Sequence, residues 1–207
     1  MLKIADTYLE EIPEYISLGS GMFADMPEEL KKQFDNVPTY EEYAEAALEP
    51  ILSHYEGKEK QPFVFTEPGT TLVARYLNFV TKVLNIKNIR GRNIATMDGS
   101  YENLGEICTM KKLPIKVLKS LEKTNFDEID LMGYTCLEQD LMYESYKGTL
   151  DKGDILLFEN VGGYSIVSKP QFIKPNCSMI CLEEDGKIKE IMREETFEDV
   201  FSKFIFE

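Results

Sequence analysis

FTEPGTTLVARYL, residues 65–77, is the stretch that decides how this chain is organised. Its first residues end a strand that the apolar run from Phe63 predicts, and Glu67, Pro68 and Gly69 follow at once. Proline fixes the local backbone and glycine has no Cβ, so the turn after the strand is tight and lets another group come close. The carboxylate of Glu67 is therefore expected at the mouth of a strand.

On the N-terminal side, the sequence predicts a strand, a helix and the strand just described. Residues 14–23, EYISLGSGMF, are a short apolar run that glycines interrupt, as expected of a strand that opens into a loop. Thr39 and Glu42 have the spacing of a capping box, and apolar residues then recur at helical spacing as far as Tyr55, which predicts about four turns. The nearly continuous apolar character of the second strand predicts parallel pairing.

Beyond Thr70 the sequence changes character. Residues 71–89 and 92–100 are rich in β-branched residues and alternate imperfectly between apolar and polar positions, which predicts a long sheet segment rather than a helix. The chain is therefore predicted to divide near residue 70. An α/β segment, residues 1–70, would precede a mostly β domain, residues 71–207.

Two turn and cap signals lie near the C-terminus. Asp185 and Gly186, inside EEDGKIKEI, mark the turn of a predicted hairpin. Thr196 and Asp199 have the spacing that caps a helix, and aromatic residues on one face follow them. The predicted domain therefore ends in a hairpin and a short helix.

Composition and charge restrict the classes of function. The 207 residues are 43% hydrophobic, which is ample for a packed core, and the formal net charge of −14 repels phosphate backbones and anionic membranes. No stretch approaches the roughly 20 apolar residues of a membrane-spanning helix, and no basic segment leads into an apolar run at the N-terminus. The sequence predicts a globular cytoplasmic protein that binds neither nucleic acid nor membrane.

The cysteines and the single histidine predict no metal site and no catalytic triad. Four cysteines are too few for a disulfide framework in a chain of this length, so free thiols are expected. Cys177 and Cys181 would lie about 13 Å apart along a strand and are predicted to be small buried hydrophobes rather than metal ligands. His54 falls near the end of the predicted helix, where a surface or helix-end role is expected.

Four motifs follow one another along the chain: SLGSGM at 17–22, EPGT at 67–70, GYTCLEQD at 133–140 and GDILLFENVGGYSIVSKPQF at 153–172. Their order resembles that of the fold-type III pyridoxal-phosphate decarboxylases, which include diaminopimelate, ornithine and arginine decarboxylases. The resemblance begins near residue 14 and corresponds to the C-terminal half of the family. It implies a partial TIM barrel, made of the last βα units, followed by a C-terminal β-sheet domain with a terminal helix.

The resemblance implies that Glu67 and Gly69 help to bind pyridoxal 5′-phosphate. This cofactor stabilises a carbanion best when its ring nitrogen is protonated, and a carboxylate within hydrogen-bonding reach of that nitrogen keeps the proton there. Glu67 fits this role at the end of a strand, and Gly69 permits a close turn beside the ring. Without the resemblance, a glutamate that faces solvent would be the preferred interpretation.

Two further motifs resemble the family's phosphate site. Gly19, Ser20 and Gly21 resemble a glycine loop whose backbone N–H groups approach the phosphate, with Ser20 in place of the middle glycine. Tyr164 matches a tyrosine whose hydroxyl contacts the same phosphate. A plain turn and a buried sheet tyrosine are the alternatives. The family commonly has an arginine after EPG that helps to neutralise the phosphate, whereas this chain has Thr70, which can only hydrogen-bond.

The GYTCLEQD motif implies residues that act on the amino-acid substrate. Cys136 matches a cysteine that protonates the carbanion after carbon dioxide leaves, a task that a thiol of ordinary pKa, about 8.5, can perform. Asp140 matches an acidic residue that receives the substrate's distal amine. In the family both come from the neighbouring subunit, which implies a homodimer. Leu137 stands where an acidic residue is common, which indicates a less cationic substrate end or lost activity; without the resemblance, Cys136 would be a core residue.

The resemblance also shows what the chain lacks. A complete barrel takes about 250 residues, against about 70 before the β domain here. The missing half would carry the lysine that forms the Schiff base with the cofactor, and no lysine of this chain lies in a matching motif. The leading hypothesis is the C-terminal portion of an amino-acid decarboxylase that needs a complementary N-terminal half for activity. The alternative is a non-catalytic, decarboxylase-like interaction module that dimerises or pairs with a partner.

Overall fold

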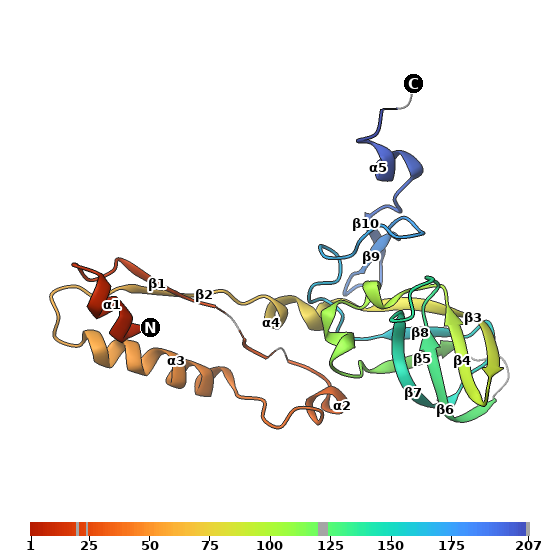
Figure 1. Ribbon diagram of the computed structural model, residues 1–207, viewed down its shortest axis with the longest axis horizontal. Coiled ribbons are helices and arrows are strands. Elements are labelled where there is room, and N and C mark those ends of the chain that lie inside the picture. The colour runs from red at the N-terminus through yellow and green to blue at the C-terminus, as the bar shows by residue number, and fades with distance from the viewer. Residues whose placement is uncertain (20, 24, 120–123, 206–207) are drawn as a thin grey trace.

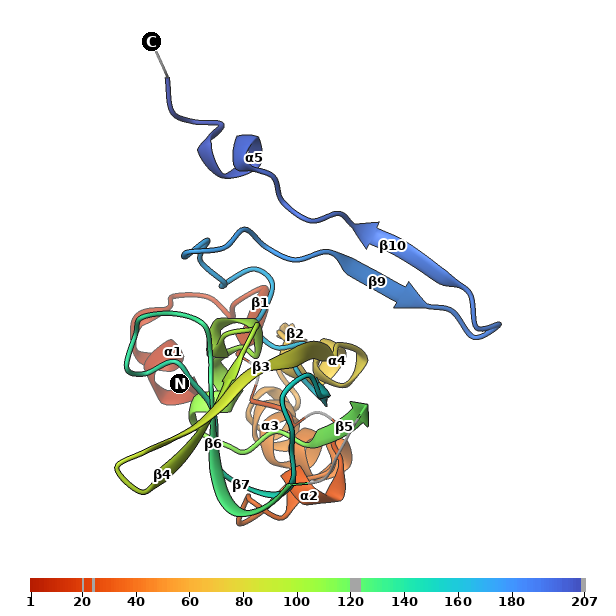
Figure 2. The ribbon, with the colours of Figure 1, turned by 90° about the vertical axis from the view of Figure 1, so that its right-hand side faces the viewer.

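The computed structural model describes residues 1–19, 21–23, 25–119 and 124–205. Figure 1 shows an elongated molecule with an N-terminal segment at one end and a curled β-sheet at the other. The N-terminal segment contains α1 (Leu2–Tyr8), β1 (Tyr15–Leu18), α2 (Glu28–Lys31), α3 (Tyr40–Tyr55) and β2 (Phe63–Thr66). Figure 2 shows a third part, the C-terminal arm of residues 179–205, which extends away from the rest.

The predicted strand, helix and strand of the N-terminal segment are confirmed. β1 and β2 pair in parallel, with Tyr15 opposite Phe63, and α3 lies between them in the chain. Thr39 begins α3 with a complete capping box. Its Oγ1 accepts from the Glu42 N–H at 3.2 Å, and its own N–H donates to the Glu42 carboxylate at 2.8 Å. These paired bonds satisfy two donors that a helix start leaves open.

The core of the N-terminal segment is small. Its buried residues are Ile16 of β1 and Ile51 and Tyr55 of α3. The two-stranded sheet leaves Phe63 71% exposed and Phe65 54% exposed. Because two strands alone are marginally stable, this segment depends on contacts beyond its own core.

Residues 71–76 are helical, where the sequence predicted a sheet. α4 (Thr70–Val73) runs directly into a 3-10 turn, η1 (Ala74–Tyr76), and the first long strand begins only after it. The prediction was therefore wrong for these residues. The backbone N–H of Gly162 donates to the Ala74 carbonyl at 3.1 Å, and such tertiary contacts outweigh the strand preference of β-branched residues.

Six strands form one curled sheet in the order β5-β8-β3-β4-β6-β7 (Figure 1), which we call the sheet domain, residues 79–158. The strands are β3 (Phe79–Ile89), β4 (Arg92–Met97), β5 (Ile115–Lys119), β6 (Asn125–Met132), β7 (Leu141–Thr149) and β8 (Ile155–Phe158). Neighbours are antiparallel except β4 and β6, which pair in parallel. The predicted β-sheet domain is thus confirmed, while β1 and β2 form a separate sheet and the described strands close no barrel.

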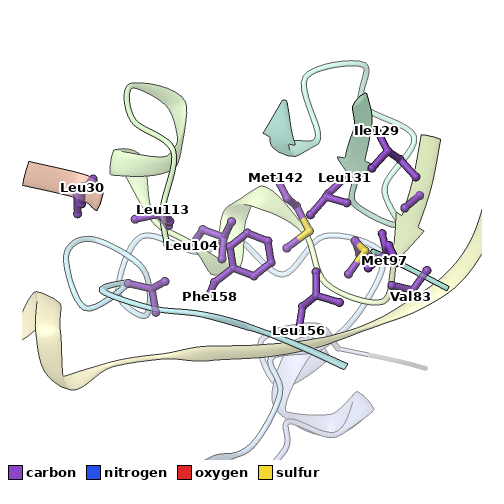
Figure 3. Close-up of a cluster of buried hydrophobic side chains, with 13 residues drawn as sticks. Leu30, Val83, Met97, Leu104, Leu113, Ile129, Leu131, Met142, Leu156 and Phe158 are labelled. Carbon is purple, nitrogen blue, oxygen red and sulfur yellow. The ribbon is translucent and has the colours of Figure 1, made fainter. Parts of the chain in front are cut away.

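The main hydrophobic core belongs to the sheet domain and its loops (Figure 3). Leu30 of α2 also enters this core, although α2 belongs to the N-terminal segment. Gln33, just after α2, exchanges two hydrogen bonds of 2.8 Å with the backbone of Lys112. These contacts fasten the N-terminal segment to the sheet domain. The buried residues of the core are Leu30, Val83, Ala95, Met97, Leu104, Leu113, Ile129, Leu131, Met142, Leu150, Leu156, Phe158 and Val161.

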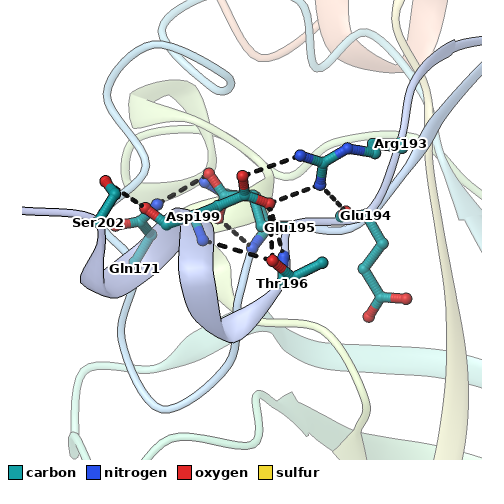
Figure 4. A network of polar contacts seen from close by, with 8 residues as sticks. Gln171, Arg193, Glu194, Glu195, Thr196, Asp199 and Ser202 are labelled. Carbon is teal, nitrogen blue, oxygen red and sulfur yellow. Dashed lines mark hydrogen bonds and ion pairs between the residues drawn. The ribbon is translucent and has the colours of Figure 1, made fainter.

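The C-terminal arm contains the predicted hairpin and helix. β9 (Met179–Leu182) and β10 (Ile188–Met192) pair antiparallel, and Gly186 adopts φ 82 in the turn. α5 (Phe197–Phe201) begins with a complete capping box between Thr196 and Asp199. Figure 4 shows Arg193 joined to the same carboxylate, with both terminal nitrogens donating, at 2.5 and 2.8 Å.

The C-terminal arm corrects the prediction of buried cysteines. Cys181 of β9 is exposed because the hairpin extends away from the sheet domain (Figure 2), and Cys177, just before the hairpin, is exposed as well. All four cysteines are free thiols, and Cys108 is the half-buried one. At the end of α3, His54 pairs through Nε2 with Asp6 of α1 at 3.0 Å, as expected of a helix-end residue.

Candidate functional site

The segment after β2 meets the segment after β8 in very close contact. Gly69 is the N-cap of α4, and Thr70 is the first residue of that helix. A Cβ atom on Gly162 would lie 2.0 Å from the Val73 carbonyl oxygen, and one on Gly163 would lie 3.0 Å from Thr70 Oγ1. Glycine is therefore required at the first position and strongly favoured at the second. Two motifs that are far apart in the sequence, EPGT and VGGY, therefore pack directly against each other here.

A cavity of about 270 Å³ opens beside this contact. Gly21, from the predicted glycine loop, lines it together with Thr70, Gly163 and Tyr164. The fold thus brings together residues of three motifs, as a phosphate-binding site would require. The apolar walls are Met22, Phe23, Met26, Phe34, Ile107 and Met110.

The loop that carries Tyr164 has unusual backbone and polar features. Asn160 and Tyr164 have φ of 66° and 55°, a left-handed conformation that non-glycine residues seldom adopt and that often marks functional sites. Asn160 is 2% exposed, and its Oδ1 has no hydrogen-bond partner among the described residues. Tyr164 is 61% exposed. A buried unpaired amide oxygen and an accessible hydroxyl beside a glycine cradle fit a ligand that is rich in hydrogen-bonding atoms.

Lys111 is a lining residue that the sequence patterns did not identify. It is the one charged side chain among the described residues that line the cavity. Its Nζ donates to the Gln33 carbonyl and lies 4.6 Å from the centre of the Phe34 ring. Thr70 brings no charge to the site, so Lys111 is the local source of positive potential. The TMKKLP stretch matches no motif, and only the fold brings this lysine to the cavity.

The other predicted cofactor residues lie outside this cavity lining. Glu67 is exposed at the exit of β2, where its carboxylate accepts a hydrogen bond from Ser17 Oγ of β1. Gly19 lines a different hollow, and its carbonyl accepts from Tyr43 at 3.5 Å, a weak bond. Ser20 lies outside the described residues. Gly69 links Glu67 to Thr70, so Glu67 lies three residues before the nearest lining residue in the chain.

The loop between β6 and β7 holds Cys136 and Asp140 in contrasting environments. Cys136 is exposed, whereas Asp140 is 1% exposed. The Asp140 carboxylate accepts from Ser100 Oγ at 3.0 Å and the Tyr101 N–H at 2.9 Å. It also accepts from Thr135, through the N–H at 3.0 Å and through Oγ1 at 2.6 Å. Four donors thus hydrogen-bond to the buried Asp140 carboxylate. These bonds connect the loop between β6 and β7, which we call the cysteine loop, to the turn after β4.

The packing around Asp140 leaves little room for a substrate amine. A Cβ atom on Gly133 would lie 2.2 Å from both carboxylate oxygens, so the carboxylate rests directly on the loop backbone. Neither Cys136 nor Asp140 lines the cavity that holds Tyr164. Their contribution to a site in a neighbouring subunit therefore stays a prediction.

Other parts of the described chain carry less chemistry. Burial raises the pKa of the Cys108 thiol to about 12, which keeps it protonated and unreactive. Among the described residues, no group of three histidine, cysteine or acidic side chains is arranged to hold a metal ion. The helices in that part of the chain are also too short or too polar to cross a membrane.

Relatives of known function align with most of the chain. Diaminopimelate decarboxylase of Helicobacter pylori is 26% identical over 190 residues, which cover 90% of this chain and 46% of the relative. The carboxynorspermidine/carboxyspermidine decarboxylase of Herminiimonas arsenicoxydans is 29% identical over 143 residues, or 67% of this chain and 37% of the relative. The chain therefore spans about half the length of the curated relatives it matches.

Solved structures and a family model agree with the sequence relatives. The diaminopimelate decarboxylase of M. jannaschii in co-complex with L-lysine superposes with a TM-score of 0.76 at 22% identity, over 100% of this chain and 46% of that one. The H. pylori enzyme complexed with L-lysine gives 0.72 at 23% identity, over 98% and 48%. The family model described as the C-terminal sheet domain of pyridoxal-dependent decarboxylases matches residues 15–162. On this match, the chain belongs to the pyridoxal-dependent decarboxylase family and corresponds to its C-terminal sheet domain.

Proposed function

We propose that this chain is the C-terminal portion of a pyridoxal-phosphate-dependent amino-acid decarboxylase of the diaminopimelate type. Its activity would depend on a complementary N-terminal barrel half that carries the lysine for the cofactor. The observation that carries the proposal is the cavity at which Gly21, Thr70 and Tyr164, from three separate motifs, converge. Membership of the family and the half-length match to its enzymes support it further.

The residues around the cavity would hold the phosphate end of the cofactor. Pyridoxal phosphate supplies the electron sink for loss of carbon dioxide, and the protein supplies orientation and charge. The Gly21 N–H and the Tyr164 hydroxyl would donate to the phosphate, and Gly163 leaves room for it. Lys111 would provide the positive charge that Thr70 lacks. Glu67, oriented by Ser17, would hold the ring-nitrogen proton.

The cysteine loop would serve a second copy of the chain. Cys136 is exposed and would deliver a proton to the carbanion in the neighbouring subunit, so the active form would be a homodimer. Asp140 would act as a positioning residue, because its four bonds hold the loop that presents Cys136. Leu137 favours an amino-acid substrate with a less cationic end than diaminopimelate.

The exposed face of the N-terminal segment is the surface that a complementary half would cover. Tyr15, Phe63 and Phe65 are each more than half exposed on the β1–β2 sheet. Both strands also have free edges, since they form a two-stranded sheet of their own. Such exposed apolar rings and edges favour pairing with further strands of a parallel barrel.

Mixing the two halves tests the proposal. The chain and a separately expressed N-terminal half of H. pylori diaminopimelate decarboxylase are combined with pyridoxal phosphate, and release of carbon dioxide from a panel of amino acids is measured. We expect release from the mixture and from neither half alone.

Tyr164→Phe should weaken cofactor binding about tenfold, as loss of a hydrogen bond to a charged group does. Tyr8→Phe, at a residue 79% exposed on α1, is the matched control and should change nothing.

The lysine substitutions test the phosphate site in the same mixture. Lys111→Met should weaken pyridoxal phosphate about tenfold while leaving the affinity for pyridoxal, which lacks the phosphate, unchanged. Lys112→Met is the matched control, since Lys112 lies over the Tyr143 ring at 5.6 Å and lines another hollow. If the mixture acquires no cofactor absorbance and the chain forms a stable cofactor-free dimer, the decarboxylase proposal is wrong.

A further inference from the structure

The loop that carries Tyr164 separates two cavities. Asn160, Gly163 and Tyr164 line the cavity described above. Val161 and Ser165, from the same loop, line a second and smaller cavity of about 120 Å³. The two cavities share no lining residue, so the second is a site distinct from the proposed cofactor site.

A buried hydroxyl without a partner lies in the wall of the second cavity. Ser165 is 4% exposed, and its Oγ has no hydrogen-bond partner among the described residues. Buried hydroxyls in folded proteins are almost always paired, so this donor marks a place where a further polar atom binds. Asn103, from the distant 3-10 turn η2 (Tyr101–Asn103), also lines the cavity.

A half-buried cation also lines the second cavity. Lys169 donates from Nζ to Asn176 Oδ1 at 2.6 Å, a neutral acceptor. Burial lowers the pKa of Lys169 below its usual value, while the nearby Cys177, Glu195 and Glu102 act in the opposite direction. The Glu195 carboxylate, however, is engaged by Gln171 Nε2 at 2.8 Å and by the Asn176 N–H at 2.7 Å. The ammonium group thus has no carboxylate in hydrogen-bond contact among the described residues.

Apolar side chains make up much of the remaining lining. They include Leu77, Phe79, Val161 and Met179, while Asn78 and Ser178 add further polar groups. An apolar cavity of about 150 Å³ holds benzene, which has six carbon atoms, so a volume of about 120 Å³ suits a ligand of about that size or smaller. The site therefore combines a cation and a hydroxyl donor with apolar side chains that can pack against a short alkyl chain.

We infer that this second cavity binds a short-chain monocarboxylic acid, whose carboxylate lies between Lys169 and Ser165 and whose alkyl chain packs against Leu77 and Met179. The carboxylate would accept from both donors and complete the pairing of each. Hydrogen bonds of this kind, between a cation or hydroxyl and a carboxylate, are among the stronger ones.

Butyrate is a suitable probe, and butylamine is its charge control. We expect isothermal titration and ligand-observed NMR to detect saturable butyrate binding to the full chain and none of butylamine. Lys169→Met should weaken butyrate at least tenfold, and Ser165→Ala should weaken it several-fold. Lys174→Met is the matched control; Lys174 lies 4.2 Å over the Tyr134 ring, away from the cavity, and its loss should leave the affinity unchanged.

Conservative variants and folding controls keep the test decisive. Lys169→Arg retains the charge and should retain most of the binding, and circular dichroism of every variant checks that the chain folds. Butyrate binding that survives both Lys169→Met and Ser165→Ala would overturn the inference. So would the absence of saturable binding, which would mean that the cavity holds only water.

Discussion

The sheet domain and the N-terminal segment bury apolar side chains to very different extents. Among the described residues, the sheet domain has a core of thirteen buried residues that includes Leu30 of α2, whereas the N-terminal segment has a separate core of three. The sheet domain has a hydrophobic interior of its own. The N-terminal segment packs against that interior through α2, and its Phe63 and Phe65 remain exposed. The candidate site lies at the seam, with Gly21 and Thr70 on one side and Tyr164 on the other. The geometry of a site at this seam therefore depends on how firmly the N-terminal segment is held against the sheet domain.

The largest expected effect separates the two cores. Leu131→Ala in β6 removes a side chain that is fully buried in the main core and should lower the free energy of unfolding by about 3 kcal/mol. Ile51→Ala in α3 should leave the main denaturant transition within about 0.5 kcal/mol and instead speed hydrogen exchange in β1 and β2, because that segment opens locally. An equal shift of the main transition by both variants would mean that the two regions unfold as one unit.

The next largest effect is expected for Asp140, the buried carboxylate of the loop between β6 and β7 that carries Cys136. Asp140→Ala leaves four donors of the sheet domain without an acceptor and should cost about 2 kcal/mol or more in denaturant unfolding. Glu138→Ala, two residues away on the exposed side of the same loop, is the control and should stay within about 0.5 kcal/mol. If both variants cost the same, Asp140 does not hold the loop.

Thiol reactivity compares the half-buried Cys108 of the sheet domain with the exposed cysteines of the same domain and of the chain beyond it. At pH 8, a thiol whose pKa is about 12 is a thiolate in roughly one molecule in 10⁴, so iodoacetamide should modify Cys108 very slowly. The exposed Cys136, Cys177 and Cys181 should react first. Peptide mass spectrometry over time measures the four rates, and rapid labelling of Cys108 in the folded chain would show that this part of the sheet domain opens readily.

The smallest expected effect concerns the arm itself. Hydrogen bonds from Arg193 and from the Thr196 N–H hold the pKa of Asp199 well below its usual value. A lowered pKa means that the carboxylate stabilises α5 fully above the usual pKa, about 3.9, and loses this effect as the pH falls toward the folded value. Asp199→Asn should therefore reduce the helicity of the arm at pH 7 while sparing the main unfolding transition. Backbone chemical shifts of residues 196–202 measure it, and unchanged shifts would contradict the role of the cap.

Local structure was predictable from the sequence wherever residues close together in the chain determine it. The capping boxes at Thr39 and Thr196 and the hairpin turn at Gly186 follow from side chains within a few residues of each other. The helix at 70–76 was not predictable in this way, since its backbone is held by Gly162, far away in the chain. The exposure of Cys181 likewise depends on where the hairpin points.

The candidate site was predictable in its motifs and not in its geometry. Motif resemblance identified Gly21 and Tyr164, and the fold brings both to one cavity. No pattern identified Lys111 or Asn160, because a lysine without a motif and an asparagine in a turn carry no signal until distant segments pack around them. The GYTCLEQD motif did identify Asp140, but its burial among four donors arises only because two loops meet in the fold.

The sequence alone determined the family, the capped helices, the hairpin and the reactive groups of the motifs, because helix caps, hydrophobic periodicity and motifs are encoded in short spans. The tertiary structure decided which polar groups are buried, which cation reaches the cavity and which apolar faces stay uncovered. These properties are set by contacts between segments far apart in the chain. Burial is a property of the whole packed molecule, and no short span of residues can specify it.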